Sequence, residues 1–232
     1  MPAVVLLSGG LDSAFNLKRA ADEIGVALAL TFDYGQRAAA REMGAAAAMS
    51  AAVGAPHRAI SLPWLGEICR TALVSAAFEV PVVRPEQLDE ARVKEGETAR
   101  AVWVPNRNGV FVNIAAAFAE SLGAELVVAG FNAEEAATFP DNTAEFAQAA
   151  TAALAFSTAT RVRVMSYTQT LGKPEIVRLG REIGAPIPRV WSCYYGGEEL
   201  CRRCESCARL ERGLRQAGAW EWFWEERGRA RG

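Results

Sequence analysis

The chain has 232 residues, of which 51% are hydrophobic and 22% are charged, and its formal net charge is -2. This length and apolar content predict one well-buried α/β domain with an appendage rather than two equal domains. The balanced charge gives no global basic field, so we expect no direct nucleic-acid partner. No apolar run approaches the roughly 18 residues of a membrane span. The start carries no secretory signal, so we expect a cytoplasmic protein without membrane contact.

A glycine turn near the start of the chain is the first functional signal. It reads Ser8-Gly9-Gly10-Leu11-Asp12-Ser13 and lies between an expected strand over 3–7 and an expected helix over 14–24. Free backbone N–H groups and the positive end of the helix dipole converge at such a turn, which therefore favours an anion. Asp12 can cap the helix or hold a metal. We expect a phosphate-bearing ligand here, and an ordinary capped turn is the alternative.

Further strand and helix signals follow the glycine turn. The apolar runs predict strands over 26–32 and 58–62, with an alanine-rich helix over 38–53 between them. Consecutive strand–helix units predict parallel strands joined by right-handed crossovers. The loop over 33–37 should therefore lie at the same edge of the sheet as the glycine turn.

The middle of the chain has a looser pattern. Mixed charges over 84–100 predict a solvated loop or a surface helix, with a mobile lid over the ligand as the alternative. A Pro-Asn turn then precedes an expected helix over 110–122, and Asn106 can adopt the left-handed backbone region there. Arg107, beside this turn, is a candidate to grip a phosphate or carboxylate, unless it is only a surface charge.

The remaining pattern predicts strands over 125–130 and 161–165 and helices over 143–154 and 175–183. Lys173 stands at the mouth of the last helix, as a candidate phosphate contact or an ordinary surface charge. Together the five expected strands predict an open five-stranded parallel sheet with helices on both faces.

Four cysteines near the C-terminus have the spacing C-x7-C-x2-C-x2-C. Thiolates two residues apart can converge on one ion, and four of them close a tetrahedral zinc site with no open position for catalysis. We predict one structural zinc per chain, with an iron–sulfur cluster and unmetallated thiols as alternatives. The aromatic tail over 220–224 should pack on the domain or on a second subunit. The predicted ligands are Cys193, Cys201, Cys204 and Cys207.

Several motifs in chain order resemble known families. The glycine turn resembles the loop of the ATP pyrophosphatases. With it come Phe-Asp-Tyr-Gly-Gln-Arg at 32–37, Val-Pro-x-Arg-Asn at 104–108, Leu-x-Lys-x-Glu-Ile-Val-x-Leu-Gly at 171–180 and Trp-Ser-Cys-Tyr-x-Gly-Gly-Glu at 191–198. With the cysteines that follow, this combination resembles the 7-cyano-7-deazaguanine synthases over nearly the whole chain.

The resemblance implies a fold, a reaction and an assembly state. The fold is adenine nucleotide alpha hydrolase-like, with an ATP-pyrophosphatase domain over 1–185, an insertion or lid-like region over 63–106 and a small zinc-binding helical segment over 186–232 packed on it. The implied enzyme is an ATP-dependent ligase that turns 7-carboxy-7-deazaguanine and ammonia into 7-cyano-7-deazaguanine, through an acyl adenylate and an amide, in queuosine and archaeosine biosynthesis. A homodimer is expected.

The resemblance also assigns roles to residues of this chain. Asp12, Ser13, Arg107 and Lys173 become the catalytic candidates, with Arg107 and Lys173 neutralising phosphate or carboxylate charge. The four cysteines become the zinc ligands. The positions implied for ATP and Mg²⁺ are Leu7, Ser8, Gly9, Gly10, Leu11, Asp12, Ser13, Phe32, Asp33 and Gln36.

The chain departs from the family pattern at three places. Ala38 replaces a common histidine, Asn106 replaces a glycine, and the loop over 132–143 differs where the acceptor should bind. A relative that amidates or adenylates another carboxylic acid is therefore an alternative. A tRNA-thiolating enzyme and a nucleotide-binding module without catalysis are two further alternatives.

Overall fold

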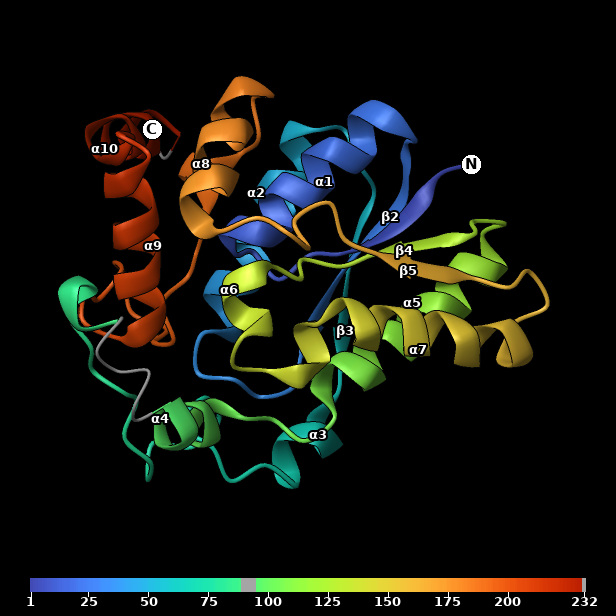
Figure 1. Ribbon diagram of the computed structural model, residues 1–232, viewed down its shortest axis with the longest axis horizontal. Helices are drawn as coiled ribbons and strands as arrows, with labels where there is room; N and C mark the ends of the chain where they lie inside the picture. Colours follow the sequence, from blue (N-terminus) through green and yellow to red (C-terminus); the bar gives the residue numbers. More distant parts are fainter. Residues whose placement is uncertain (89–94, 231–232) are drawn as a thin grey trace.

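The structure is a computed structural model that describes residues 1–88 and 95–230 (Figure 1). A five-stranded sheet has the order β3-β2-β1-β4-β5, and every neighbouring pair of strands is parallel. This confirms the predicted α/β fold with an open parallel sheet. The strands are β1 (Ala3–Leu6), β2 (Val26–Asp33), β3 (His57–Ser61), β4 (Leu126–Val128) and β5 (Arg163–Met165).

Helices cover both faces of this sheet (Figure 1). In the view of Figure 1, α1 (Leu11–Glu23), α2 (Ala39–Ala52) and α8 (Lys173–Glu182) lie above it, and α5 (Arg107–Ser121) and α7 (Ala144–Ser157) lie below. The shorter elements are α3 (Pro63–Glu67), η1 (Pro85–Gln87), α4 (Glu95–Val102), α6 (Ala133–Ala136), η3 (Pro140–Asn142) and η4 (Ile187–Arg189). The chain ends in α9 (Glu205–Gln216) and α10 (Trp220–Arg229).

The central strand explains why two hydrophobic cores form. In β1, Val5 packs into the core on one face and Val4 into the core on the other, and both side chains are fully buried. Successive side chains of a strand point to opposite faces, so a strand covered on both sides must be apolar throughout. The continuous apolar run of β1 meets this requirement, and side chains of β1 pack into a hydrophobic core on each face of the sheet.

Three helices begin earlier than the sequence predicted. α1, α5 and α8 start at Leu11, Arg107 and Lys173 instead of 14, 110 and 175. The first turn of a helix has no intrahelical partners for its N–H groups, so apolar periodicity does not mark it. The correction matters because Asp12, Arg107 and Lys173 now lie in first turns, at the helix ends that face the carboxyl edge of the sheet.

The segment over 63–106 is fastened to the cysteine segment. The Val83 N–H donates to the Arg203 carbonyl at 3.2 Å, and the Glu205 N–H donates to the Pro81 carbonyl at 3.1 Å. The charged stretch predicted as loop or surface helix contains α4. Residues 89–94 of this stretch lie outside the described residues, and the lid stays a prediction.

The aromatic tail packs on the domain, which is the first of the two predicted alternatives. Phe223 of α10 is fully buried in the core that also contains residues of α1 and α8. Arg227 Nη1 donates to the carbonyl oxygens of Pro188 at 3.0 Å and Val190 at 2.7 Å. Within the described ranges, no helix has both the length and the apolar character needed to cross a bilayer.

The burial of Phe223 allows a matched test of how the tail contributes to stability. We expect Phe223→Ala to lower the free energy of unfolding by about 3–5 kcal/mol, because it removes a core ring and leaves a cavity. Phe156→Ala is the control, since this ring is 95% exposed and its loss should cost under about 0.5 kcal/mol. Urea unfolding followed by circular dichroism measures both. Equal effects of the two substitutions would contradict the packing of α10.

Candidate active site

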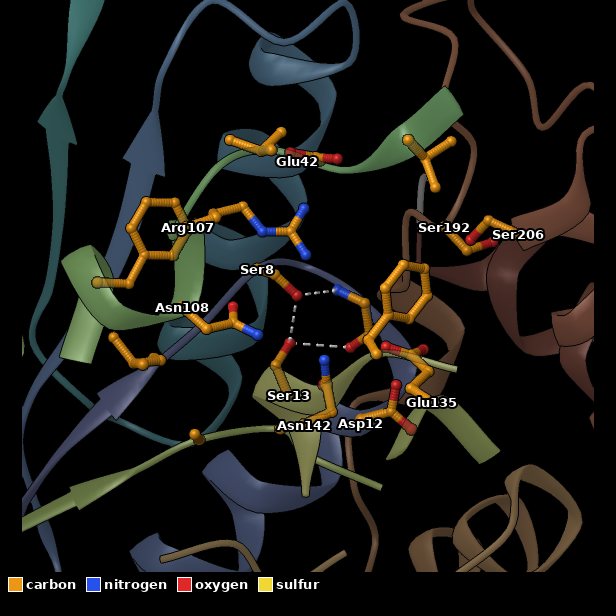
Figure 2. Close-up of a pocket in the computed structure, with 18 of the residues that line it drawn as sticks. Ser8, Asp12, Ser13, Glu42, Arg107, Asn108, Glu135, Asn142, Ser192 and Ser206 are labelled. Carbon is orange, nitrogen blue, oxygen red and sulfur yellow. Dashed lines mark hydrogen bonds between the residues drawn. The ribbon is translucent and has the colours of Figure 1, made fainter. Parts of the chain in front are cut away.

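A cavity of about 270 Å³ opens at the carboxyl ends of β1 and β4. β1 pairs with β2 on one side and with β4 on the other, so the chain leaves these two neighbouring central strands in opposite directions. Such a point in an open parallel sheet leaves a crevice, and ligands bind there. The cavity is lined by the glycine turn and by residues of α5, α6, α8 and the C-terminal segment (Figure 2).

The glycine turn is ordered by its own hydrogen bonds. Ser8 Oγ accepts from the Gly10 N–H at 3.3 Å and lies 3.2 Å from Ser13 Oγ, which donates to the Gly10 carbonyl at 3.0 Å (Figure 2). Gly9 has a φ of 81°, and a Cβ there would lie 2.8 Å from the Glu42 carbonyl oxygen, so only glycine fits. The turn at the start of α1 is thus a preformed cradle for an anion.

A buried ion triad forms beside the turn. Lys173 Nζ lies 2.6 Å from Asp12 Oδ2 and 2.8 Å from Glu135 Oε1, and the lysine side chain is only 8% exposed. Burial alone would lower the pKa of Lys173, but the two carboxylates raise it above its usual value. Lys173 therefore stays charged throughout the neutral range.

The two carboxylates of the triad differ in their environment. Burial raises the pKa of Asp12, and Lys173 offsets only part of this effect. Burial also acts on Glu135, but the attraction of Lys173 outweighs it and lowers the pKa. Asp12 Oδ1 is buried and has no hydrogen-bond partner among the described residues. An orphaned carboxylate oxygen at this place fits a metal cation, since carboxylate oxygens are ligands of Mg²⁺.

Arg107 enters the cavity from the first turn of α5, on the side opposite Asp12 and Glu135 (Figure 2). Burial would lower the pKa of its guanidinium, but Tyr34 and Asp141 raise it, so the charge is permanent. A desolvated guanidinium binds phosphate or carboxylate through two parallel N–H bonds. Two cations, Arg107 and Lys173, thus face the cavity from different helices.

The cysteine segment also contributes to the cavity wall. Trp191, Ser192 and Tyr194 line it, and so do Glu205 and Ser206. Sequence reasoning gave this segment a structural role and missed these residues. The available signal was their position next to the cysteines. Trp191, Ser192 and Tyr194 lie within two residues of Cys193, and Glu205 and Ser206 lie between Cys204 and Cys207.

The four cysteines converge, as their spacing predicts. Their Sγ atoms all lie within 4.8 Å of one another, and Cys201 and Cys207 are 3.9 Å apart. Zn–S bonds of about 2.3 Å place the corners of a tetrahedron about 3.8 Å apart, so the donor set fits zinc. Backbone N–H groups of Cys204 and Tyr195 donate to the sulfurs of Cys201 at 3.3 Å and Cys193 at 3.4 Å, and these bonds orient the two sulfurs.

The cysteine segment supports the glycine turn and Lys173. The Trp191 N–H donates to the Gly9 carbonyl at 2.9 Å. Helix α9 lies so close to α8 that a Cβ at Gly213 would be 2.9 Å from Lys173 Cβ. Glu134 accepts from the Lys173 N–H at 2.8 Å and pairs with Arg212 at 2.9 Å. The start of α8 is therefore held between α6 and α9.

Not every candidate residue lies in the cavity wall. Leu7, Leu11 and Phe32 line the cavity with Gln36, whereas Gly9 and Asp33 are not among the described residues that line it. Asp33 Oδ1 accepts from the Gly35 N–H at 3.0 Å, inside its own loop. The side-chain amide of Gln36 is also engaged in hydrogen bonds within the protein, since its nitrogen donates to the Phe32 carbonyl and to Glu42. Both side chains order the loop after β2.

Comparison with known proteins gives the family. The family model described as "Queuosine biosynthesis protein QueC" matches residues 2–218. The chain belongs to the QueC family. A protein of Pelotomaculum thermopropionicum is 56% identical over 218 residues, which cover 94% of this chain and 98% of that one. A protein of Methanosarcina mazei is 47% identical over 221 residues, covering 94% and 95%. Both relatives are named 7-cyano-7-deazaguanine synthase.

The structure accounts for one departure from the QueC pattern and shows how the altered loop over 132–143 begins. Asn106 stands where the family has glycine, and its φ of 51° is the predicted left-handed conformation, which asparagine tolerates better than most residues. Asn132 caps α6 by accepting from the Glu135 N–H at 3.0 Å, which sets Glu135 facing Lys173. Nothing in the structure explains Ala38 in place of histidine.

The geometry of the cysteine cluster makes a metal prediction for this QueC-family chain. We expect purified protein to hold about one zinc per chain, and Cys207→Ser to lose the metal and lower the melting temperature. Cys69→Ser is the control, because Cys69 is buried in the core far from the cluster in sequence and should leave the zinc content unchanged. Atomic emission spectrometry reads the metal. Iron with labile sulfide would contradict the prediction.

Proposed function

We propose that the cavity binds Mg²⁺-ATP and 7-carboxy-7-deazaguanine and, with ammonia, makes 7-cyano-7-deazaguanine. The carrying observation is the preformed anion cradle at the start of α1, flanked by Lys173 and Arg107 in one cavity. The names of the two relatives support the choice of the deazaguanine acid as the acceptor substrate. We further propose that the protein works as a cytoplasmic homodimer on small-molecule substrates, without a direct nucleic-acid partner.

The charges in the cavity support a requirement for a divalent cation. Among the described residues of the cavity wall, carboxylates outnumber cationic side chains by five to three. ATP adds further negative charge, which the wall alone leaves unbalanced. Asp12 and Glu135 would hold Mg²⁺, and the ion would neutralise the charge that grows on the departing pyrophosphate. The orphaned Oδ1 of Asp12 supports this role.

The proposed reaction needs little acid–base chemistry from side chains. The substrate carboxylate attacks the α-phosphate of ATP, the bond to the β-phosphate breaks, and pyrophosphate leaves. Ammonia then attacks the acyl carbon, AMP leaves, and the amide remains after loss of a proton. The amide oxygen attacks the α-phosphate of a second ATP, and a second pyrophosphate leaves. Loss of AMP and protons then gives the nitrile. These reaction steps depend mainly on the positioning of the reactants and on the neutralisation of their charge.

Each group in the wall has a part in this sequence. The N–H groups of the glycine turn hold the pyrophosphate, and Lys173 neutralises its charge. Arg107 binds the acid carboxylate or the α-phosphate from the other side, which brings two anions together against their repulsion. The cysteine segment closes the wall with Trp191 and Tyr194 and excludes water that would hydrolyse the acyl adenylate.

Substitution of Asp12 tests the proposal on the reaction itself. Asp12→Asn keeps the shape of the side chain but removes its charge, so we expect pyrophosphate release with the acid, ATP and ammonium to fall at least about 100-fold. Asp22→Asn is the control on the same helix, because Asp22 is exposed and pairs with Lys18 at the surface. Coupled pyrophosphate detection and chromatography of the nitrile measure both.

The outcomes separate the two parts of the proposal. An unchanged rate in Asp12→Asn would contradict the assignment of Asp12. Wild-type protein that yields neither AMP nor nitrile from 7-carboxy-7-deazaguanine would contradict the acceptor.

A further inference from the structure

Two aromatic rings that stack on each other form part of the wall of the cavity. The rings of Trp103 and Phe139 are 11° from parallel, with centroids 6.1 Å apart, and both line the cavity. They come from separate parts of the chain, one after α4 and the other before η3. Both are half-buried. The free ring face of such a stacked pair can stack on a planar heteroaromatic ring.

A carboxylate lies next to this wall. Asp141 follows Phe139 by two residues and also lines the cavity. Its loop is anchored, because Asn108 Nδ2 donates to the Asp141 carbonyl at 3.1 Å and Gln169 Nε2 donates to the Asn142 carbonyl at 2.9 Å. Asp141 Oδ1 accepts from Asn142 Nδ2 at 3.1 Å. A carboxylate offers about four acceptor sites, so capacity remains for two donors of a ligand.

We infer that Trp103 and Phe139 stack on the bicyclic ring of the acceptor and that Asp141 reads its guanine edge. This inference rests on the proposed function, and it names the residues that select the substrate. A guanine-type ring presents two adjacent donors, N1–H and the 2-amino group, and one carboxylate accepts from both. An adenine-type edge presents one donor and one acceptor, so a carboxylate pairs with it only once.

The same rule keeps the adenine of ATP away from Asp141. The aromatic pair at the end of β2, Phe32 and Phe111, is already stacked, with centroids 4.2 Å apart and planes 16° from parallel. Both rings line the cavity and offer the adenine an apolar surface. The 7-carboxylate of the acceptor lies on its five-membered ring, away from the N1 edge. A ring held by Asp141 therefore leaves its carboxylate free to reach the α-phosphate.

A change of hydrogen-bonding pattern at position 141 tests the inference. Asp141→Asn offers one acceptor and one donor, which matches an adenine-type edge. With α,β-methylene-ATP bound, we expect calorimetry to show weaker binding of 7-carboxy-7-deazaguanine by about 5- to 150-fold and tighter binding of 7-carboxy-7-deazaadenine. The affinity for the ATP analogue should stay within about twofold.

A second variant separates stacking from edge recognition. We expect Trp103→Leu to weaken both ring types by a similar factor, about 5- to 150-fold, and to leave their ratio unchanged. Glu145→Gln is the control, because Glu145 is exposed in the first turn of α7 and should change neither affinity. Melting temperatures of the variants confirm that each is folded.

The outcomes distinguish this inference from the proposed function. If the wild type binds and converts 7-carboxy-7-deazaguanine but Asp141→Asn leaves the ratio of the two ring affinities unchanged, the inference is overturned and the proposed function stands. A loss of affinity for the ATP analogue in Trp103→Leu, with the acid unaffected, also overturns it. Wild-type protein that binds the ATP analogue but not the acid overturns both.

Discussion

A buried ammonium between two carboxylates determines how the cavity is assembled. Lys173 from α8 joins Asp12 from α1 and Glu135 from α6, three segments that are far apart in the sequence. Taking charges out of water is costly, and only close partners offset the cost. Removing one partner of such a pair leaves an uncompensated buried charge, typically at about 3–5 kcal/mol. The triad thereby fixes the loop after β4 against the glycine turn.

The order of the strands explains why phosphate chemistry and ring recognition can share one cavity. β1 delivers the glycine turn and β4 delivers the loop that carries Glu135, Phe139 and Asp141, and the two strands are neighbours whose chains leave in opposite directions. The anion cradle and the loop with Phe139 and Asp141 therefore line the same cavity.

Local signals predicted the strands and the glycine turn because each is contiguous in the sequence. The starts of α1, α5 and α8 were placed too late, since polar first turns carry no apolar period. Glu135 was missed because its pairing with Lys173 spans 38 positions and depends on packing. The available signal was a lysine at the mouth of a helix at the ligand edge of the sheet, since a buried ammonium requires carboxylate partners.

The cysteine segment does more than close the C-terminal end of the chain. Its backbone holds the Gly9 carbonyl through Trp191, its helix α9 supports Lys173 through Gly213, and its loop pairs with Pro81 and Val83. A loop with little core of its own depends on its cross-link for order, and binding of a structural zinc supplies on the order of 10 kcal/mol for this. The order that the cysteines impose is thus transmitted to the cradle, to the ammonium and to the wall of the cavity. The cluster can support catalysis without touching a substrate.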